Sequence, residues 1–178
     1  KPLIIDTIAK THATILGFQE TKKEDFSSSY LKSLVRNRDF SWHHLPWKRL
    51  AGGILMGVDQ EIFEIIAWSH LDFSVSFELW HKCNGNLFRV IIVYGSPYEE
   101  GKGAFISELH TLFVDFSIPT LIGGDFNLVR NANEKSNLSL DVGLAILHFY
   151  GTLGLILNLE NVASGWRNGG SLEMILLT

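Results

Sequence analysis

The chain has one cysteine, four prolines and no long apolar run, and each of these shortages removes a class of protein. Cys83 has no second cysteine with which to form an internal disulfide, so a disulfide-stabilised scaffold is excluded. No stretch of about 18 consecutive apolar residues is present, so we expect no membrane-spanning helix. The first residues include an early acid, Asp6, and no apolar core of a signal peptide. We therefore expect an intracellular protein, either nuclear or cytoplasmic.

Positive charge is also scarce, because 15 Lys and Arg residues face 19 Asp and Glu residues, for a net charge of -4. Domains that bind nucleic acid through the phosphate backbone are usually basic. The balance therefore argues against tight DNA binding, although a nuclease that binds transiently can obtain positive charge from a metal ion. The seven histidines show no zinc-ligand spacing. We interpret the neighbouring pair His43 and His44 as loop surface.

What the chain does contain is apolar sequence, 46% of its residues, with the periods of helices and strands. Its length fits one domain, residues 1–178. Residues 73–81 alternate between apolar and polar side chains, which predicts a strand with one wetter face, and Asn84 and Gly85 predict a hairpin turn. The pattern predicts helices at 3–13, 25–38, 103–116 and 140–153, and strands at 14–18, 52–58, 62–68, 73–81, 87–94 and 120–122.

The most informative stretch is residues 119–127, where a short apolar strand runs into two glycines, then Asp125 and Asn127. In an extended chain, residues two apart project from the same face, so the carboxylate and the carboxamide could point at one spot. A carboxylate can bind Mg²⁺ or orient a water molecule, and an amide can donate to a phosphoryl oxygen. The alternative is a plain turn after a buried strand, because Gly, Asp and Asn are turn residues.

Two further apolar runs end in polar groups of the same kind. The run that begins at residue 13 ends at Glu20, and the run that begins at residue 88 ends at Tyr94. The alternatives are an exposed loop acid for Glu20 and a buried strand-end aromatic for Tyr94. Three strands thus each end in a group that can contact a metal or a phosphate.

These segments resemble the endonuclease–exonuclease–phosphatase superfamily, which has the fold of DNase I and the apurinic endonucleases. More closely, the chain resembles the endonuclease domain of plant LINE-type (non-LTR) retrotransposons. The resemblance covers roughly residues 1–166, in the family's order and at about its spacing. It depends on LGFQETK (16–22), AGGILMGV (51–58), VYGSPYE (93–99) and IGGDFNLVR (122–130), followed by EKSN (134–137).

The resemblance implies an α/β (α+β) fold, a DNase I-like four-layer αββα sandwich, truncated at both ends. It implies hydrolysis of a phosphodiester in DNA with Mg²⁺ or Mn²⁺. By the family's pattern, Glu20 binds the metal and Tyr94 contacts the phosphate. Asp125 orients or activates the attacking water, and Asn127 holds the phosphate. A reverse-transcriptase region could belong to a longer parent protein.

The chain also departs from the family's pattern. We find neither the first strand with its asparagine nor the final Asp–His pair, and residues 171–178 read as divergent. Gly165 takes the place of the family's threonine, and His148 lies in a helical-looking stretch. We therefore expect weak or no nuclease activity. The alternative is a noncatalytic fragment or a weak nucleic-acid-binding remnant. A phosphoesterase for inositol phosphates or sphingolipids is less favoured, because basic substrate-specific loops are missing.

Overall fold

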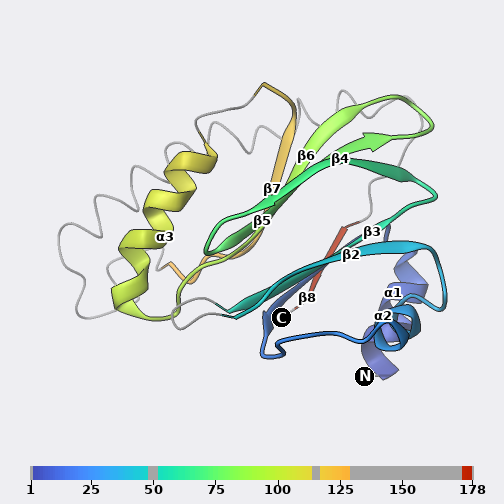
Figure 1. Cartoon of the computed structure of the whole chain (residues 1–178), viewed down its shortest axis with the longest axis horizontal. Helices are drawn as coiled ribbons and strands as arrows, with labels where there is room; N and C mark the ends of the chain where they lie inside the picture. Colours follow the sequence, from blue (N-terminus) through green and yellow to red (C-terminus); the bar gives the residue numbers. More distant parts are fainter. Residues whose placement is uncertain (1, 48–51, 114–116, 129–173, 178) are drawn as a thin grey trace.

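The computed structural model describes residues 2–47, 52–113, 117–128 and 174–177, which form three helices and eight strands (Figure 1). In the described part of the chain, no helix is both long enough and apolar enough to cross a membrane. In chain order the elements are α1 (Pro2–Thr11), β1 (Ile15–Thr21), α2 (Ser28–Leu34), β2 (Phe40–Leu45), β3 (Gly53–Asp59), β4 (Phe63–His70), β5 (Ser74–His81), β6 (Leu87–Tyr94), α3 (Glu99–Leu112), β7 (Thr120–Asp125) and β8 (Met174–Leu177).

The strands form two sheets of four, with the orders β2-β3-β1-β8 and β4-β5-β6-β7. In the first sheet β1 runs antiparallel to β3 and parallel to β8. In the second sheet β4, β5 and β6 form an antiparallel meander, and β7 joins β6 in parallel. A parallel neighbour requires a crossover connection, and the crossover from β6 to β7 contains α3.

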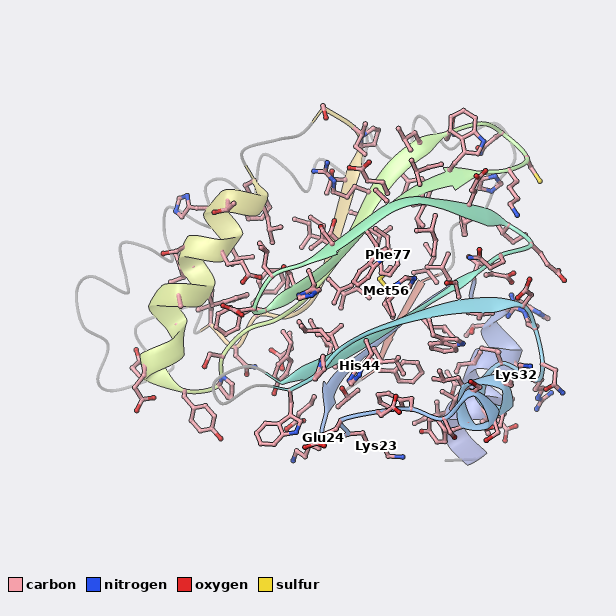
Figure 2. All side chains as sticks on the ribbon, in the orientation of Figure 1. Lys23, Glu24, Lys32, His44, Met56 and Phe77 are labelled. Atoms are coloured by element: carbon pink, nitrogen blue, oxygen red, sulfur yellow. The ribbon has the colours of Figure 1, made fainter. Side chains whose placement is uncertain are left out.

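The largest part of the core lies between the two sheets, where Figure 2 shows Met56 of β3 and Phe77 of β5. Both side chains are fully buried. Helices α1 and α2 pack on the outer face of the first sheet, and α3 packs on the outer face of the second (Figure 1). The layers are therefore helix, sheet, sheet and helix, and the predicted αββα sandwich is confirmed.

Most predicted elements are confirmed, with shifted ends. Strand β1 continues three residues past its predicted end and so includes Glu20. Helix α2 begins after the cap Ser27, whose side chain accepts from the Tyr30 amide, but it stops at Leu34 instead of continuing to residue 38. The next turn contains left-handed Arg36 and Asn37, which end the helix. Helix α3 begins at Glu99, four residues early, because two acids in its first turn interact favourably with the helix dipole.

The interpretation of His43 and His44 as loop surface was wrong, because both lie in strand β2, which the sequence analysis missed. The His43 ring packs 4.6 Å from the Trp68 ring and 4.9 Å from the Phe77 ring, which lie in the other sheet. The His44 ring meets Phe26 edge to face at 4.8 Å. Burial lowers the pKa of both imidazoles, although the charge of Asp25 opposes this for His44. The pair therefore packs between elements.

The segment interpreted as divergent also contains a strand, β8, which extends the first sheet beside β1. Other predictions lie outside the described residues. These are the helix at 140–153, His148 within it, Gly165 in the place of the family's threonine, and the EKSN segment at 134–137.

Candidate functional site

The site begins where β6 and β7 end side by side. In this parallel pair Tyr94 stands opposite Asp125, the last residue of each strand. The Gly95 amide donates to the Asp125 carbonyl at 2.7 Å, so the two chains stay together one residue further. A Cβ atom on Gly95 would lie 2.0 Å from the Phe126 carbonyl oxygen, so only glycine permits this approach. The register therefore brings the Tyr94 and Asp125 positions to one end of the second sheet.

Asn127 closes this end of the sheet through both its backbone and its side chain. Its amide donates to Asp125 Oδ1 at 2.9 Å, and its Nδ2 donates to the Gly95 carbonyl at 2.8 Å. Its carboxamide also lies near enough to the Tyr94 hydroxyl to lower the pKa of that group. Asn127 has a φ of 48° and lies beyond the end of β7, so strand alternation does not bring it to Asp125. The two side chains meet through a tight turn stabilised by the Asp125 carboxylate.

Glu20 reaches the same place from the other sheet. It lies in β1 with a φ of 54°, and the pairing of β1 with β3 shifts register between Phe18 and Thr21. Leu16 and Phe18 belong to the core cluster under the helices, so simple alternation would direct Glu20 toward that side. The left-handed residue and the bulge break this alternation. The Glu20 side chain is 52% exposed, and its Oε1 lies 3.8 Å from Lys22 Nζ.

The electrostatics of Tyr94 connect the four predicted site residues. Burial raises the pKa of its hydroxyl above the ordinary value of 10.0, and the charges of Glu20 and Asp125 raise this pKa further. The hydrogen bond from Asn127 opposes the rise. These charges act on the hydroxyl because Glu20 and Asp125 lie near it. The structure therefore brings Glu20, Tyr94, Asp125 and Asn127 together, and the Tyr94 hydroxyl stays neutral and able to donate.

Gly52 makes room for the Tyr94 ring. A Cβ atom on Gly52 would lie 2.2 Å from Tyr94 Cε1, so the backbone before β3 packs directly against the tyrosine. The Tyr94 residue is only 6% exposed. Gly52 lies in the AGGILMGV motif but was not among the predicted site residues.

The oxygen ligands at this site suit a hard divalent cation. Mg²⁺ keeps several of its waters and is usually held by one or two carboxylates together with substrate phosphate oxygens. Glu20 and Asp125 supply two carboxylates, one from each sheet. Among the described residues, no group of three or more His, Cys, Asp and Glu side chains could hold a metal. The donor set therefore fits Mg²⁺ or Mn²⁺ shared with a phosphate and does not form a closed protein cage.

Gln19, which directly precedes Glu20, was not among the predicted site residues. Its side chain is 5% exposed, and its Nε2 donates to the Val93 carbonyl in the opposite sheet. The available signal was a carboxamide at the end of an apolar run, on the same strand face as the inter-sheet residue Ile15.

Comparisons with known proteins agree with this architecture. The model of the Endonuclease/Exonuclease/phosphatase family matches residues 3–172. A comparison with curated proteins found no match.

Among solved structures, the human Nocturnin catalytic domain with bound sulfate has a TM-score of 0.55 and 17% identity, over 71% of this chain and 56% of that one. The Bacteroides thetaiotaomicron mannosyl-6-phosphatase Bt3783 has a TM-score of 0.53 and 15% identity, over 79% and 59%. ANGEL2, a 2',3'-cyclic phosphatase, has a TM-score of 0.55 and 14% identity, over 74% and 44%. The matched region spans less than two thirds of each of these structures. At these identities the likeness shows the fold alone.

Proposed function

Because the chain belongs to the endonuclease/exonuclease/phosphatase family, we propose that it is a Mg²⁺-dependent hydrolase of phosphodiester bonds in DNA. The observation that carries the proposal is the convergence of Glu20, Asp125 and Asn127 on Tyr94. The charges of both carboxylates act on the Tyr94 hydroxyl, and the Asn127 amide donates to Asp125 Oδ1. Two carboxylates and two neutral donors are the groups that a phosphodiesterase needs around one phosphate.

Each residue has a role that its geometry supports. Glu20 would hold the metal, which when bound polarises a phosphoryl oxygen and lowers the pKa of a bound water. Asp125 would orient the attacking water, since one of its oxygens accepts from the Asn127 amide and its position is thereby restrained. Tyr94 would donate its hydroxyl proton to a nonbridging oxygen, because its raised pKa keeps the hydroxyl protonated.

The side chain of Asn127 contacts other groups of the protein that border the site. Its Nδ2 donates to Gly95, and its carboxamide contacts the Tyr94 hydroxyl. We therefore infer that Asn127 orients Tyr94 and Asp125 in addition to holding phosphate, which is the role implied by the family resemblance.

The substrate class comes from two sources. Two of the similar structures are named as phosphatases, the mannosyl-6-phosphatase and the 2',3'-cyclic phosphatase. Their names support phosphoester hydrolysis on this fold. The choice of DNA depends on the resemblance of the four quoted motifs to LINE-type endonuclease domains. We also infer from these motifs an origin in a plant non-LTR retrotransposon. A reverse-transcriptase region in the genomic sequence next to this segment is the expected observation, and an unrelated flanking gene would oppose this origin.

Nicking of supercoiled plasmid with Mg²⁺ tests the activity. We expect nicking that EDTA abolishes and that falls by roughly two to three orders of magnitude in Asp125→Asn and in Glu20→Gln, because each removes a charge from a concerted site. Glu24→Gln is the matched control, since Glu24 is an exposed acid in the turn after β1 (Figure 2). The wild-type rate also tests the prediction of weak turnover.

Two results would contradict the proposal. Nicking that survives in both site variants would place the activity elsewhere or in a contaminant. The absence of nicking at every protein and metal concentration would favour the alternative, a noncatalytic domain that binds nucleic acid weakly or not at all.

A further inference from the structure

Gln19 is a buried polar side chain that the proposed chemistry does not use. It lies on β1 on the face that looks toward the second sheet, in line with Ile15 of the inter-sheet core. A buried carboxamide is costly unless it is hydrogen-bonded. Its Nε2 donates to the Val93 carbonyl of β6, so this hydrogen bond crosses from one sheet to the other.

The hydrogen bond joins the residues that directly precede two of the four site residues, and the residue that precedes a third lies beside it. Gln19 precedes Glu20 and Val93 precedes Tyr94, while Gly124 stands opposite Val93 in β7 and precedes Asp125. Gly124 has a φ of 145°, and a Cβ atom there would lie 1.9 Å from the Val93 oxygen and 2.5 Å from Gln19 Nε2. The glycine therefore leaves the space that the carboxamide occupies.

This contact matters because the site is divided between the two sheets. Backbone hydrogen bonds hold strands in register within each sheet. The sheets meet through apolar side chains, whose attraction has no preferred direction and therefore restrains small displacements of one sheet along the other less sharply than a directional contact does. A side-chain hydrogen bond is directional, so it can restrain that position.

We propose that Gln19 is a positioning residue, which holds the Glu20 half of the site at the correct distance from the Tyr94 and Asp125 half. The inference rests on the proposed function, because it assigns Gln19 to the same metal and phosphate site. Gln19 itself contacts neither metal nor substrate and acts through the strands on which the site residues lie.

The test is Gln19→Met, which keeps the length of the side chain and removes the donor. We expect kcat for plasmid nicking to fall roughly ten- to hundredfold, because small misplacements of reacting groups are costly. Calorimetry should show Mg²⁺ or Mn²⁺ affinity falling about tenfold or more, as for other residues that support metal ligands. The KM for DNA should change less than about threefold, since binding contacts away from the metal remain.

Asp59→Asn is the matched control. Asp59 is also buried, pairs with Arg38 and lies at the far end of β3 from the site. The Asp59→Asn substitution should lower the unfolding midpoint without changing kcat or metal affinity. If Gln19→Met does not fold, Gln19→Asn replaces it, because this variant keeps the donor but is one methylene too short to reach Val93. We expect the same direction of change in Gln19→Asn.

The outcomes separate the two proposals. The positioning role alone would be overturned if the wild-type protein binds metal and nicks DNA and the Gln19 variant has the same kcat and metal affinity. Equal losses in the Gln19 variant and in Asp59→Asn would also overturn it, since they would reflect general destabilisation. Wild-type protein that neither binds metal nor nicks DNA would overturn the proposed function and this inference with it.

Discussion

At the scale of single residues, two non-glycine residues of the site have left-handed backbones. Glu20 has a φ of 54° and Asn127 a φ of 48°. Such conformations cost roughly 1–3 kcal/mol for residues other than glycine, with asparagine at the lower end, and they persist where surrounding contacts impose them. Glu20 leaves the alternation of β1 by this conformation, and Asn127 turns back to Asp125. The strain is therefore tied to the side-chain arrangement that the proposed chemistry needs.

The ionisation of Tyr94 gives a prediction at this scale. Without metal, Glu20→Gln should lower the pKa of the Tyr94 hydroxyl toward 10.0, because it removes a neighbouring negative charge, whereas Glu24→Gln should not change it. An NMR titration of ring-labelled tyrosine measures this pKa, with the resonance assigned by its loss in Tyr94→Phe. Equal Tyr94 pKa values in wild type and Glu20→Gln would mean that the carboxylate is not near the hydroxyl.

The sign of the linked stability follows from the raised pKa. Because the native pKa of Tyr94 lies above its unfolded value, the neutral hydroxyl favours the native state below pH 10. This contribution is lost as the pH rises through the native pKa.

At the scale of elements, α3 is attached to the turn between β4 and β5 by one carboxylate. Glu108 accepts hydrogen bonds from the Asp72 amide at 2.8 Å, the Phe73 amide at 3.1 Å and the Ser74 hydroxyl at 2.6 Å. The Phe73 carbonyl accepts from the Tyr94 amide at 2.9 Å, so the same turn also borders the candidate site. Burial nevertheless raises the pKa of Glu108 above its ordinary value, with the hydrogen bonds opposing.

The raised pKa of Glu108 therefore predicts that the free energy of unfolding depends on pH. With a native pKa above the unfolded value, its contribution to stability is complete below about pH 4.5 and is lost as the pH rises through the native pKa. The difference in unfolding free energy between wild type and Glu108→Gln should shrink from pH 4 to pH 7. The decrease should be about 1.4 kcal/mol for each unit by which the native pKa exceeds the unfolded pKa. Urea unfolding of both proteins at the two pH values measures it. A difference that grows with pH would contradict the raised pKa.

At the scale of the whole molecule, stability depends on the apolar layer between the sheets. Phe77 is fully buried there, and its ring is 4.9 Å from His43 of the opposite sheet. The outer clusters under α1 and α2 and under α3 are separate sets of buried residues. Loss of contacts in the middle layer should therefore weaken both halves of the site together.

Phe77→Ala should lower the free energy of unfolding by about 3–5 kcal/mol, because it removes buried surface and leaves a cavity in the middle layer. Leu71→Ala is the control, since Leu71 is 41% exposed, and its cost should stay within about 0.5 kcal/mol. Guanidinium unfolding of both variants measures these values. Equal costs for the two substitutions would show that the sheets do not pack on each other at Phe77.

Local sequence was sufficient for much of this fold. Alternation at 73–81 predicted a strand, and Asn84 and Gly85 predicted the turn before β6. These features depend on neighbours within a few residues, so the chain carries them wherever it folds. The motifs also singled out Glu20, Tyr94, Asp125 and Asn127, which the structure brings together, while their catalytic roles stay predictions.

Only the tertiary structure decided how these four residues meet. Strand alternation directs Glu20 toward the helices, and a left-handed residue in a bulge redirects it. The partner of Gln19 is a carbonyl 74 residues away in the other sheet. His43 of strand β2 packs against Phe77 of the other sheet, and no local sequence pattern predicts this contact. Such contacts depend on how two sheets pack face to face, and that arrangement is set by the sum of distant apolar contacts instead of by any one segment.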